Sequence, residues 1–209
     1  MSQDELRGLL LRRAAAADFA LDDPLLERLE TYFRLLARWN GRINLTGFSL
    51  KDPTDQAIDR LIVEPLLITR ALRYPIGVWF DLGTGSGSPA VPIQLYRPAK
   101  TLVLVESKER KAAFLREVTR QMRLDQTRVE CTRIESLAMT DQLVGMADLV
   151  TIRAVRPSEA VIASIRGLLR VGGLAVLVGS KPDRFVTQRG FEVAPSTGID
   201  SVSSLLVKT

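Results

Sequence analysis

The chain of 209 residues contains no histidine and a single cysteine. The absence of histidine excludes Ser-His-Asp and Cys-His catalysis as well as histidine-ligated metal sites. One cysteine excludes an intrachain disulfide framework and fits a reducing cytoplasm. No apolar stretch approaches the roughly 18 residues that a membrane span requires, and residues 1–7 are acidic before they are basic, unlike a secretory signal. We therefore expect a cytoplasmic protein with no metal and no membrane contact, whose catalysis proceeds without an imidazole base.

The basic residues are unusual in kind, because 23 of the 29 are arginine. The net charge is +5, and the isoelectric point is near 9.7. Arginine presents a planar fork to phosphate and stacks on bases, so this excess favours a nucleic-acid partner. A GC-rich genome would also enrich arginine codons, and composition alone does not separate the two interpretations.

Helical periodicity dominates the first 75 residues. The second helix is expected to end at Asn40-Gly41, and Pro65 predicts a kink or a break in the third. We expect residues 1–75 to form an N-terminal helical subdomain, which is a candidate RNA-facing or site-covering element. The expected helices span residues 3–20, 24–39 and 53–73.

From residue 76 to residue 209, strand-like runs alternate with helical runs. Alternating βα units predict an α/β domain with a mainly parallel sheet, helices on both faces and right-handed crossovers. The last two strand-like runs are joined by a turn around residues 196–198, which predicts a terminal antiparallel hairpin. The expected strands are 77–82, 102–105, 128–131, 148–152, 174–178, 191–194 and 205–208, and the expected helices are 90–96, 108–122 and 158–169.

A glycine-rich turn follows the first expected strand, with Gly83, Gly85 and Gly87 at alternate positions. Glycines accept positive φ and let a ligand lie against bare backbone, so the turn is a candidate cradle for a nucleoside cofactor. Gly85-x-Gly87-x-x-Ala90 also satisfies the dinucleotide pattern. No Lys-Ser/Thr pair follows the glycines, which argues against a phosphate-binding P-loop.

Three details favour S-adenosylmethionine over a dinucleotide at this turn. Asp81 precedes the glycines, where it could anchor the turn or bind the amino-acid end of the ligand. Pro89 and Pro92 disfavour the long helix that usually receives a pyrophosphate. The chain also ends in an expected hairpin instead of a second nucleotide-binding half. A nicotinamide-dependent oxidoreductase using the same turn stays open as an alternative.

Polar side chains follow the next three expected strands. Glu106 closes the second strand, where an acid commonly accepts from ribose hydroxyls. Ile134 and Glu135 follow the third, where they could flank an adenine and accept from its amine, although Glu135 could equally be an ordinary loop acid. Arg153 follows the fourth, at the edge where open α/β sheets bind ligands. Its alternative is a surface arginine near Asp148.

The expected helix over 108–122 carries a mainly basic exposed face, which includes Arg110 and Lys111. A solvated face is the commoner explanation of such charge, and RNA binding is the alternative. Arg38 and Arg42 lie in the N-terminal helical region and are further candidates for RNA contact.

These residues together resemble a known family, the bacterial 16S ribosomal RNA guanine-N7 methyltransferases, also called glucose-inhibited division protein B. The resemblance extends from about residue 32 to residue 178, and the first of its motifs is the most telling because generic methyltransferases lack it. The motifs are Trp39-Asn-x-x-Ile-Asn-Leu-Thr46, Asp81-Leu-Gly-Thr-Gly-Ser-Gly-x-Pro89, Glu106-Ser107 followed by Lys111-Ala-Ala-Phe-Leu115, Arg133-Ile-Glu135, and Arg153-Ala154.

The resemblance implies a Rossmann-like class I methyltransferase fold and transfer of a methyl group from S-adenosylmethionine to N7 of a guanine in the 530-loop region of 16S ribosomal RNA. Neutral guanine N7 has an in-plane lone pair and needs no general base, which agrees with a chain that lacks histidine. We expect a monomer that acts on this RNA or on the small ribosomal subunit. The predicted cofactor-binding residues are Asp81, Gly83, Gly85, Gly87, Ser88, Glu106, Ile134, Glu135 and Arg153, of which Arg153 is also the predicted catalytic residue. The predicted RNA-binding residues are Arg38, Arg42, Arg110, Lys111, Arg133 and Lys181.

Three positions depart from the family pattern. Ala90 stands where the family usually has glycine, and Val178 stands where the family has a lysine, with Lys181 close by but offset. The family's His-x-x-Asp-Ser-Leu motif is reduced to Gln-Ala-Ile-Asp-Arg-Leu over residues 56–61. A divergent member that binds the methyl donor or RNA with little or no turnover is therefore a second alternative.

Overall fold

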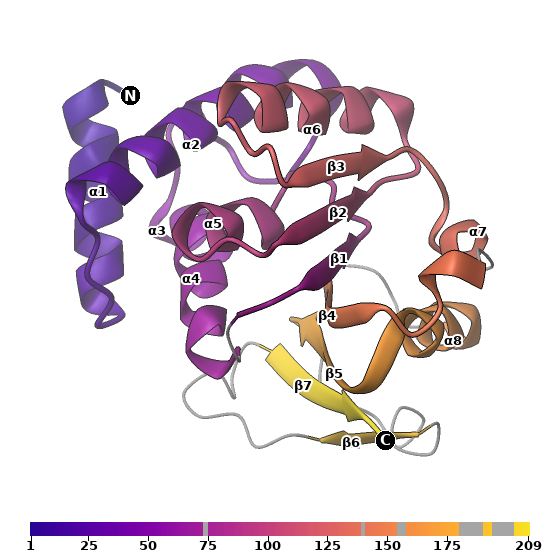
Figure 1. Cartoon of the computed structure of the whole chain (residues 1–209). Helices are drawn as coiled ribbons and strands as arrows, with labels where there is room; N and C mark the ends of the chain where they lie inside the picture. Colours follow the sequence, from indigo (N-terminus) through magenta and orange to yellow (C-terminus); the bar gives the residue numbers. More distant parts are fainter. Residues whose placement is uncertain (73–74, 139–140, 154–157, 180–189, 194–202) are drawn as a thin grey trace.

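A seven-stranded sheet with strand order β3-β2-β1-β4-β5-β7-β6 forms the centre of the molecule (Figure 1). In this computed structural model, which describes residues 1–72, 75–138, 141–153, 158–179, 190–193 and 203–209, β1 to β5 are parallel. β7 pairs antiparallel with both β5 and β6. The strands are β1 (Val78–Leu82), β2 (Thr101–Val105), β3 (Thr127–Glu130), β4 (Ala147–Arg153), β5 (Leu169–Val178), β6 (Phe191–Val193) and β7 (Ser203–Lys208). The predicted parallel sheet with a terminal hairpin is confirmed.

Helices cover both faces of this sheet, as βα alternation predicts. None of the helices in the described residues is long and apolar enough to cross a membrane. The helices are α1 (Gln3–Ala16), α2 (Asp23–Ile43), α3 (Asp55–Ile58), α4 (Glu64–Ile68), α5 (Ala90–Tyr96), α6 (Glu109–Gln121), α7 (Ile134–Ala138) and α8 (Glu159–Leu168), with a π-helical segment over Asp59–Val63 and 3-10 turns over Thr69–Ala71 and Asp141–Leu143.

Alternation along the strands divides the core into two clusters. Trp79 in β1 belongs to the cluster that also contains the N-terminal helices, α5 and α6. Its neighbours Phe80 and Leu82 belong to the cluster under α7 and α8. Successive strand side chains point to opposite faces of a sheet, so one strand contributes to both clusters. Residues 1–72 therefore share a continuous apolar core with one face of the sheet.

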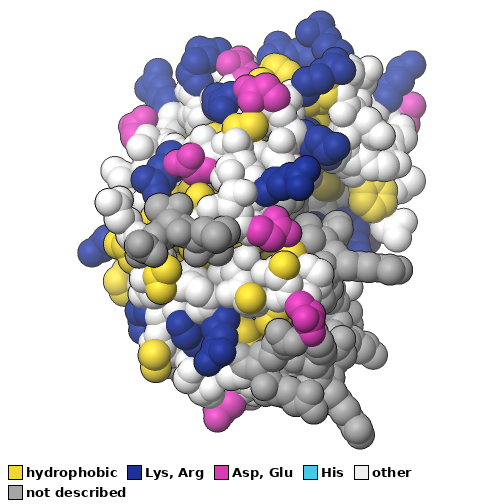
Figure 2. Space-filling view, turned by 90° about the vertical axis from the view of Figure 1, so that its right-hand side faces the viewer, with side chains coloured by type: hydrophobic (Ala, Val, Ile, Leu, Met, Phe, Trp, Pro, Cys, Tyr) yellow, Lys and Arg dark blue, Asp and Glu magenta, His cyan; other side chains and the backbone are white. Residues whose placement is uncertain are grey.

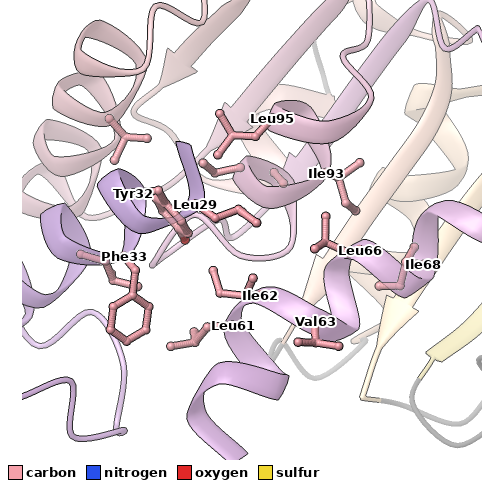
Figure 3. Close-up of a cluster of buried hydrophobic side chains, with 14 of the residues drawn as sticks. Leu29, Tyr32, Phe33, Leu61, Ile62, Val63, Leu66, Ile68, Ile93 and Leu95 are labelled. Carbon is pink, nitrogen blue, oxygen red and sulfur yellow. The ribbon is translucent and has the colours of Figure 1, made fainter. Parts of the chain in front are cut away.

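Figure 3 shows where the N-terminal helices join the rest of the core. Leu29 and Tyr32 of α2 lie beside Ile62 of the π-helical segment and Leu66 of α4, and Ile93 of α5 closes the cluster. All five side chains are buried. This packing fixes α2 and the segment over residues 55–71 against the sheet, next to the turn that follows β1.

The end of α2 differs from the prediction, because the helix continues through Asn40-Gly41 to Ile43. Asn44 takes the left-handed conformation with φ of 50° and ends the helix by donating its N–H to the Asn40 carbonyl at 3.2 Å. Asn40 itself stays helical, and its side chain caps the next loop. The predicted stop was therefore a few residues early.

The predicted interruption at Pro65 takes the form of a change of helix type. The helical run continues from Asp55 to Ala71, and the π-helical segment lies directly before Pro65. The N–H of Glu64 donates to the carbonyl of Asp59, five residues earlier. A single π turn of this kind accommodates a local disruption without ending the helix. The predicted strand at 174–178 starts earlier than expected, at Leu169, and the hairpin turn expected at 196–198 lies outside the described residues.

Candidate active site

A pocket of about 530 Å³ opens where β1, β2, β4 and β5 end, and we call it the strand-end pocket. Its walls are Gly83 and Gly85 after β1, Glu106 after β2, Arg153 at the end of β4, and residues 45–48 of the loop after α2. A second hollow of about 630 Å³ lies near α8, where Lys208 donates to the carbonyl of Leu169 at the amino end of β5. Open α/β sheets bind ligands at the carboxyl ends of strands, so the strand-end pocket is the candidate site.

The glycine turn follows β1 and forms one wall of this pocket. Gly83, Gly85 and Gly87 have φ of 70°, 56° and 91°, which L side chains rarely adopt. A Cβ on Gly87 would lie 3.1 Å from the Tyr32 hydroxyl, and that hydroxyl donates to the Ser86 carbonyl at 2.8 Å. The turn is therefore held by its own backbone geometry and by α2. Gly87 lies against Tyr32 and is not part of the pocket lining, whereas Gly83, Gly85 and Ser88 line the pocket.

Glu106 holds the turn from the side of β2. Its Oε2 accepts from the Gly85 N–H at 3.0 Å, and its Oε1 accepts from the Lys108 N–H at 2.8 Å. The side chain is buried and lines the strand-end pocket. Each carboxylate oxygen can accept more than one hydrogen bond, so both oxygens can still receive ribose hydroxyls from the pocket.

Asp81 lies beneath the turn and is buried. Its Oδ1 accepts from the Thr151 hydroxyl, which in turn accepts from the Trp79 indole N–H at 2.8 Å. Its Oδ2 is buried and has no hydrogen-bond partner among the described residues. Burial raises the pKa of Asp81 to about 6, against the lowering effect of the Thr151 and Thr84 hydrogen bonds and the charge of Arg153. This uncompensated carboxylate favours a cation placed against the turn.

Arg153 joins three elements at the end of β4. Its Nη1 donates to the carbonyl of Arg60 and to the Ser88 Oγ, the latter at 3.2 Å. Its Nη2 pairs with the Glu64 carboxylate at 3.2 Å. Burial lowers the pKa of Arg153, and the Glu64 charge opposes that shift. Arg153 lines the pocket as predicted, and it also connects β4 to the glycine turn and to α4.

The contact between Arg153 and the carbonyl of Arg60 has a cause in the chain itself. The Glu64 N–H, which would serve the Arg60 carbonyl in a regular α-helix, bonds instead to Asp59. The residue after it is Pro65, which has no N–H to donate. Because a buried carbonyl without a donor is costly, the guanidinium of Arg153 replaces the missing helical donor.

The loop after α2 forms the opposite wall. The Asn40 side-chain oxygen accepts from the N–H groups of Leu45 and Thr46 at 2.7 and 2.9 Å. The Asn40 amide nitrogen reaches the Phe48 carbonyl at 3.4 Å. Leu45, Thr46 and Phe48 line the strand-end pocket. The motif that most distinguishes the sequence, residues 39–46, therefore builds a wall of the pocket.

Four of the predicted RNA-binding residues lie where α2 packs against α6, a junction that we call the α2–α6 seam. They are Arg38 and Arg42 on α2, and Arg110 and Lys111 on α6. At this seam the Trp39 and Phe114 ring centroids are 5.8 Å apart, and Arg110 donates to the Arg42 carbonyl at 3.5 Å. Lys111 also lines the strand-end pocket. Figure 2 shows Lys and Arg side chains gathered in the upper part of this face, at the height of α2 and α6 in Figure 1.

Three further predicted residues, Arg133, Ile134 and Glu135, are not part of the pocket lining. Arg133 and Glu135 are exposed at the start of α7, and Ile134 packs against the core cluster under α7 and α8. Lys181 lies outside the described residues. The roles predicted for these four residues stay predictions.

The predicted set lacked Arg60 and residues 45–48 of the pocket lining. It also lacked Tyr32, Glu64 and Thr151, which contact the glycine turn, Arg153 and Asp81. Tyr32 was placed on an apolar helix face, and nothing in its spacing indicates that its hydroxyl reaches the glycine turn. Thr151 could have been found, because a threonine next to Asp81 follows once β1 and β4 are paired in register. The contacts of Arg60 and Glu64 with Arg153 could not be predicted, because they depend on how the helical run packs against strands that are distant in the sequence.

The described residues fit S-adenosylmethionine on three observations. The pocket volume lies within the range of about 300–1,000 Å³ typical of small-molecule sites. The buried Oδ2 of Asp81, next to the turn, has no hydrogen-bond partner among the described residues, which suits a ligand that carries positive charge. Glu106 offers carboxylate oxygens for a vicinal diol. Among the described residues, no group of three or more His, Cys, Asp and Glu side chains could hold a metal.

Comparison with known sequences gives a consistent match over most of the chain. The sequence model of the family described as rRNA small subunit methyltransferase G matches residues 25–193. A protein named ribosomal RNA small subunit methyltransferase G from Halorhodospira halophila is 36% identical over 176 residues, which cover 84% of this chain and 79% of that protein. Its namesake from Paracoccus denitrificans is 37% identical over 152 residues, which cover 73% and 75%.

Two solved structures with a similar fold are distant from this chain in sequence. A SAM dependent methyltransferase from Aquifex aeolicus matches with a TM-score of 0.57 at 10% identity, over 76% of this chain and 94% of that one. Ribosomal protein L11 methylase from Lactobacillus delbrueckii subsp. bulgaricus matches with a TM-score of 0.55 at 17% identity, over 76% and 81%. These matches show the fold alone, and they confirm the predicted Rossmann-like methyltransferase class.

Proposed function

The chain belongs to the rRNA small subunit methyltransferase G family, and on that basis we propose that it transfers a methyl group from S-adenosylmethionine to the RNA of the small ribosomal subunit. S-adenosylmethionine supplies an electrophilic methyl group on a sulfonium when it is bound. Glu106 and the backbone of Gly83 and Gly85 would hold it, with the Asp81 carboxylate behind the turn. These groups are fixed by hydrogen bonds within the protein, so they orient a ligand without rearranging.

The acceptor that suits this site best is N7 of a guanine in 16S RNA. The observation that carries this proposal is that the carboxylates at the pocket are engaged. Glu106, which lines the pocket, accepts from two backbone N–H groups, and Glu64, which is not part of the lining, pairs with Arg60 and Arg153. Neither is free to act as a general base, and the chain has no histidine. Neutral guanine N7 already carries a lone pair in the ring plane and loses no proton on methylation. The protein therefore contributes alignment, which in well-oriented systems is worth roughly 7–11 kcal/mol.

The target base must leave its stack to reach the pocket. Specific RNA recognition usually targets unpaired bases that can be splayed out, and enzymes that modify bases take them out of the helix. The α2–α6 seam carries exposed Arg38, Arg42 and Arg110 beside the pocket and is the surface we propose for the RNA backbone. We further propose that the protein acts as a monomer in the cytoplasm, on the small-subunit RNA or on the assembled subunit.

The proposal is tested by incubating the protein with methyl-labelled S-adenosylmethionine and transcribed small-subunit RNA or purified small subunits. We expect label in one or both of these substrates and none in large-subunit RNA. Calorimetry with S-adenosylmethionine and with NAD provides the parallel binding test. Affinity for NAD alone would support an oxidoreductase instead, and donor affinity without transfer to either substrate would indicate a binding protein that has lost turnover.

A further inference from the structure

Arg60 forms the wall of the strand-end pocket that faces the end of β5. Its Nη1 contacts both oxygens of Glu64, at 3.1 and 3.0 Å. Arg153 contacts the same carboxylate from the other side, at 3.2 Å. Two guanidinium groups thus share the Glu64 carboxylate, and Arg153 also interacts with the charge of Asp81.

Arg60 is the most exposed member of this cluster. The Arg153 and Glu64 side chains are only 17% and 14% exposed, whereas that of Arg60 is 40% exposed. The Arg153 guanidinium donates hydrogen bonds to the Arg60 carbonyl, Ser88 and Glu64. Within the described residues, the hydrogen bonds of the Arg60 guanidinium use only Nη1, so Nη2 keeps its donors for a ligand.

Gly179 leaves room for such a ligand beside Arg60. It follows β5 with φ of 78°, and a Cβ at this position would lie 3.6 Å from the Arg60 Nη2. Bare backbone and a half-exposed guanidinium therefore border the same corner of the pocket. Arginine in this setting presents a fork that matches the oxygens of a phosphate.

The position of this corner indicates which molecule brings the phosphate. Glu106 follows β2 and Gly179 follows β5, and the strand order β2-β1-β4-β5 separates these two strands by three steps. At roughly 4.8 Å a step, the two ends are roughly 14 Å apart. The methyl donor is held at the β1 and β2 ends, so the β5 end belongs to the acceptor.

We propose that Arg60 binds a backbone phosphate of the RNA next to the guanine that enters the strand-end pocket. Arg60 is then a positioning residue for the acceptor, and this inference rests on the proposed function. It predicts that the chain needs Arg60 for RNA affinity but not for affinity toward the methyl donor.

The test compares Arg60→Gln and Arg60→Lys with the unmodified chain. Lys100→Gln is the matched control, since it removes one exposed positive charge just before β2, at the opposite edge of the sheet. The readouts are affinity for transcribed small-subunit RNA over a series of salt concentrations, and calorimetric affinity for S-adenosylmethionine. Glu64 keeps Arg153 as a partner in both Arg60 variants, so circular dichroism should confirm an unchanged fold.

We expect Arg60→Gln to weaken RNA binding about tenfold and to lower the salt slope by about 0.7 to 1. Arg60→Lys should recover part of both effects, Lys100→Gln should change neither, and donor affinity should stay constant throughout. Unchanged RNA affinity in Arg60→Gln would overturn the proposal. Loss of donor affinity without loss of RNA affinity would overturn it too, because the anion would then be the donor's carboxylate. If the unmodified chain itself transfers no methyl group to RNA, the proposed function fails before any variant is compared.

Discussion

At the scale of a single residue, burial of the Asp81 carboxylate lowers the folding stability of the chain at neutral pH. Burial raises its pKa from the usual 3.8 to about 6, so between these values the folded chain binds more protons than the unfolded chain. Folding stability from this group is therefore lost as the pH rises from about 4 to about 6, by on the order of 3 kcal/mol. Such a cost to folding is expected of a carboxylate that serves a bound ligand, which is the role predicted for Asp81.

Asp81→Asn should remove this cost. Asparagine keeps an oxygen for the Thr151 hydroxyl but cannot ionise. The difference in unfolding free energy between the variant and the unmodified chain should grow in favour of the variant as the pH rises from 4 to 6, and should stay constant above pH 6. The variant should also bind S-adenosylmethionine more weakly. Urea unfolding at a series of pH values and calorimetry measure both effects. The exposed control Asp125→Asn should run parallel to the unmodified chain, and a parallel curve for Asp81→Asn would contradict this account of Asp81.

Glu106 makes the second prediction for a single residue. Its two oxygens accept from two backbone N–H groups, and in Glu106→Gln one of those donors would face an amide NH₂. We expect a loss of about 1–3 kcal/mol in stability and a 10- to 100-fold weaker affinity for S-adenosylmethionine. Glu130→Gln, at the end of the neighbouring strand β3, is the matched control and should leave donor affinity unchanged. Equal donor affinity in the two variants would show that Glu106 does not hold the donor.

At the scale of elements, the π-helical segment couples Pro65 to Arg153. Arg153 donates to the carbonyl of Arg60, for which Pro65 has no N–H. In Pro65→Ala, an N–H at residue 65 becomes available to that carbonyl, so Arg153→Met should cost less stability when it is combined with Pro65→Ala than when it is made in the unmodified chain. Urea unfolding of the four proteins should give a coupling of about 0.5–3 kcal/mol.

The same cycle with Pro98→Ala in place of Pro65→Ala is the control. Pro98 is exposed, so no coupling to Arg153 is expected. An equal cost of Arg153→Met with and without Pro65→Ala would contradict the proposed replacement of the helical donor. It would then follow that the ion pair with Glu64 accounts for the contribution of Arg153.

The elements also show what can be predicted from the sequence and what cannot. The strands and the short α5 were predictable, because short apolar runs, glycines and prolines act locally. The π-helical segment was not, because its stability depends on Arg153, far away in the sequence. The end of α2 was missed for a similar reason: Asn40 carries the typical signal of a helix stop, but here its side chain caps residues 45 and 46 instead.

In the candidate site, too, the residues at strand ends could be predicted from the sequence, whereas those placed by helix packing could not. Gly83, Gly85, Glu106 and Arg153 were predicted from strand ends and Ser88 from the family resemblance, and all five line one pocket. Arg60 lies in a helical run whose exposed face gave no signal of a site, so only the packed structure brings it to the pocket. The contacts of Tyr32 with the glycine turn and of Glu64 with Arg153 likewise depend on packing.

At the scale of the whole molecule, the N-terminal helices and the sheet share one apolar cluster. A continuous core predicts a single cooperative unfolding transition, although residues 1–75 and 76–209 differ in secondary structure. Trp39 lies in α2 and Trp79 in β1, so Trp79→Phe and Trp39→Phe each leave one fluorescent reporter. In each variant, fluorescence and far-ultraviolet circular dichroism should give the same urea midpoint. An earlier transition at Trp39 than in the circular dichroism would mean that the helical region unfolds on its own.

The central claim is that the strand-end pocket methylates guanine at N7 in small-subunit RNA. The most direct measurement is to react the RNA with labelled S-adenosylmethionine, digest it to nucleosides and identify the labelled base by mass spectrometry. The account predicts 7-methylguanine as the labelled base, at a rate that falls in Glu106→Gln but not in Glu130→Gln. Label on another atom of guanine, on another base, or at an equal rate in the two variants would contradict it.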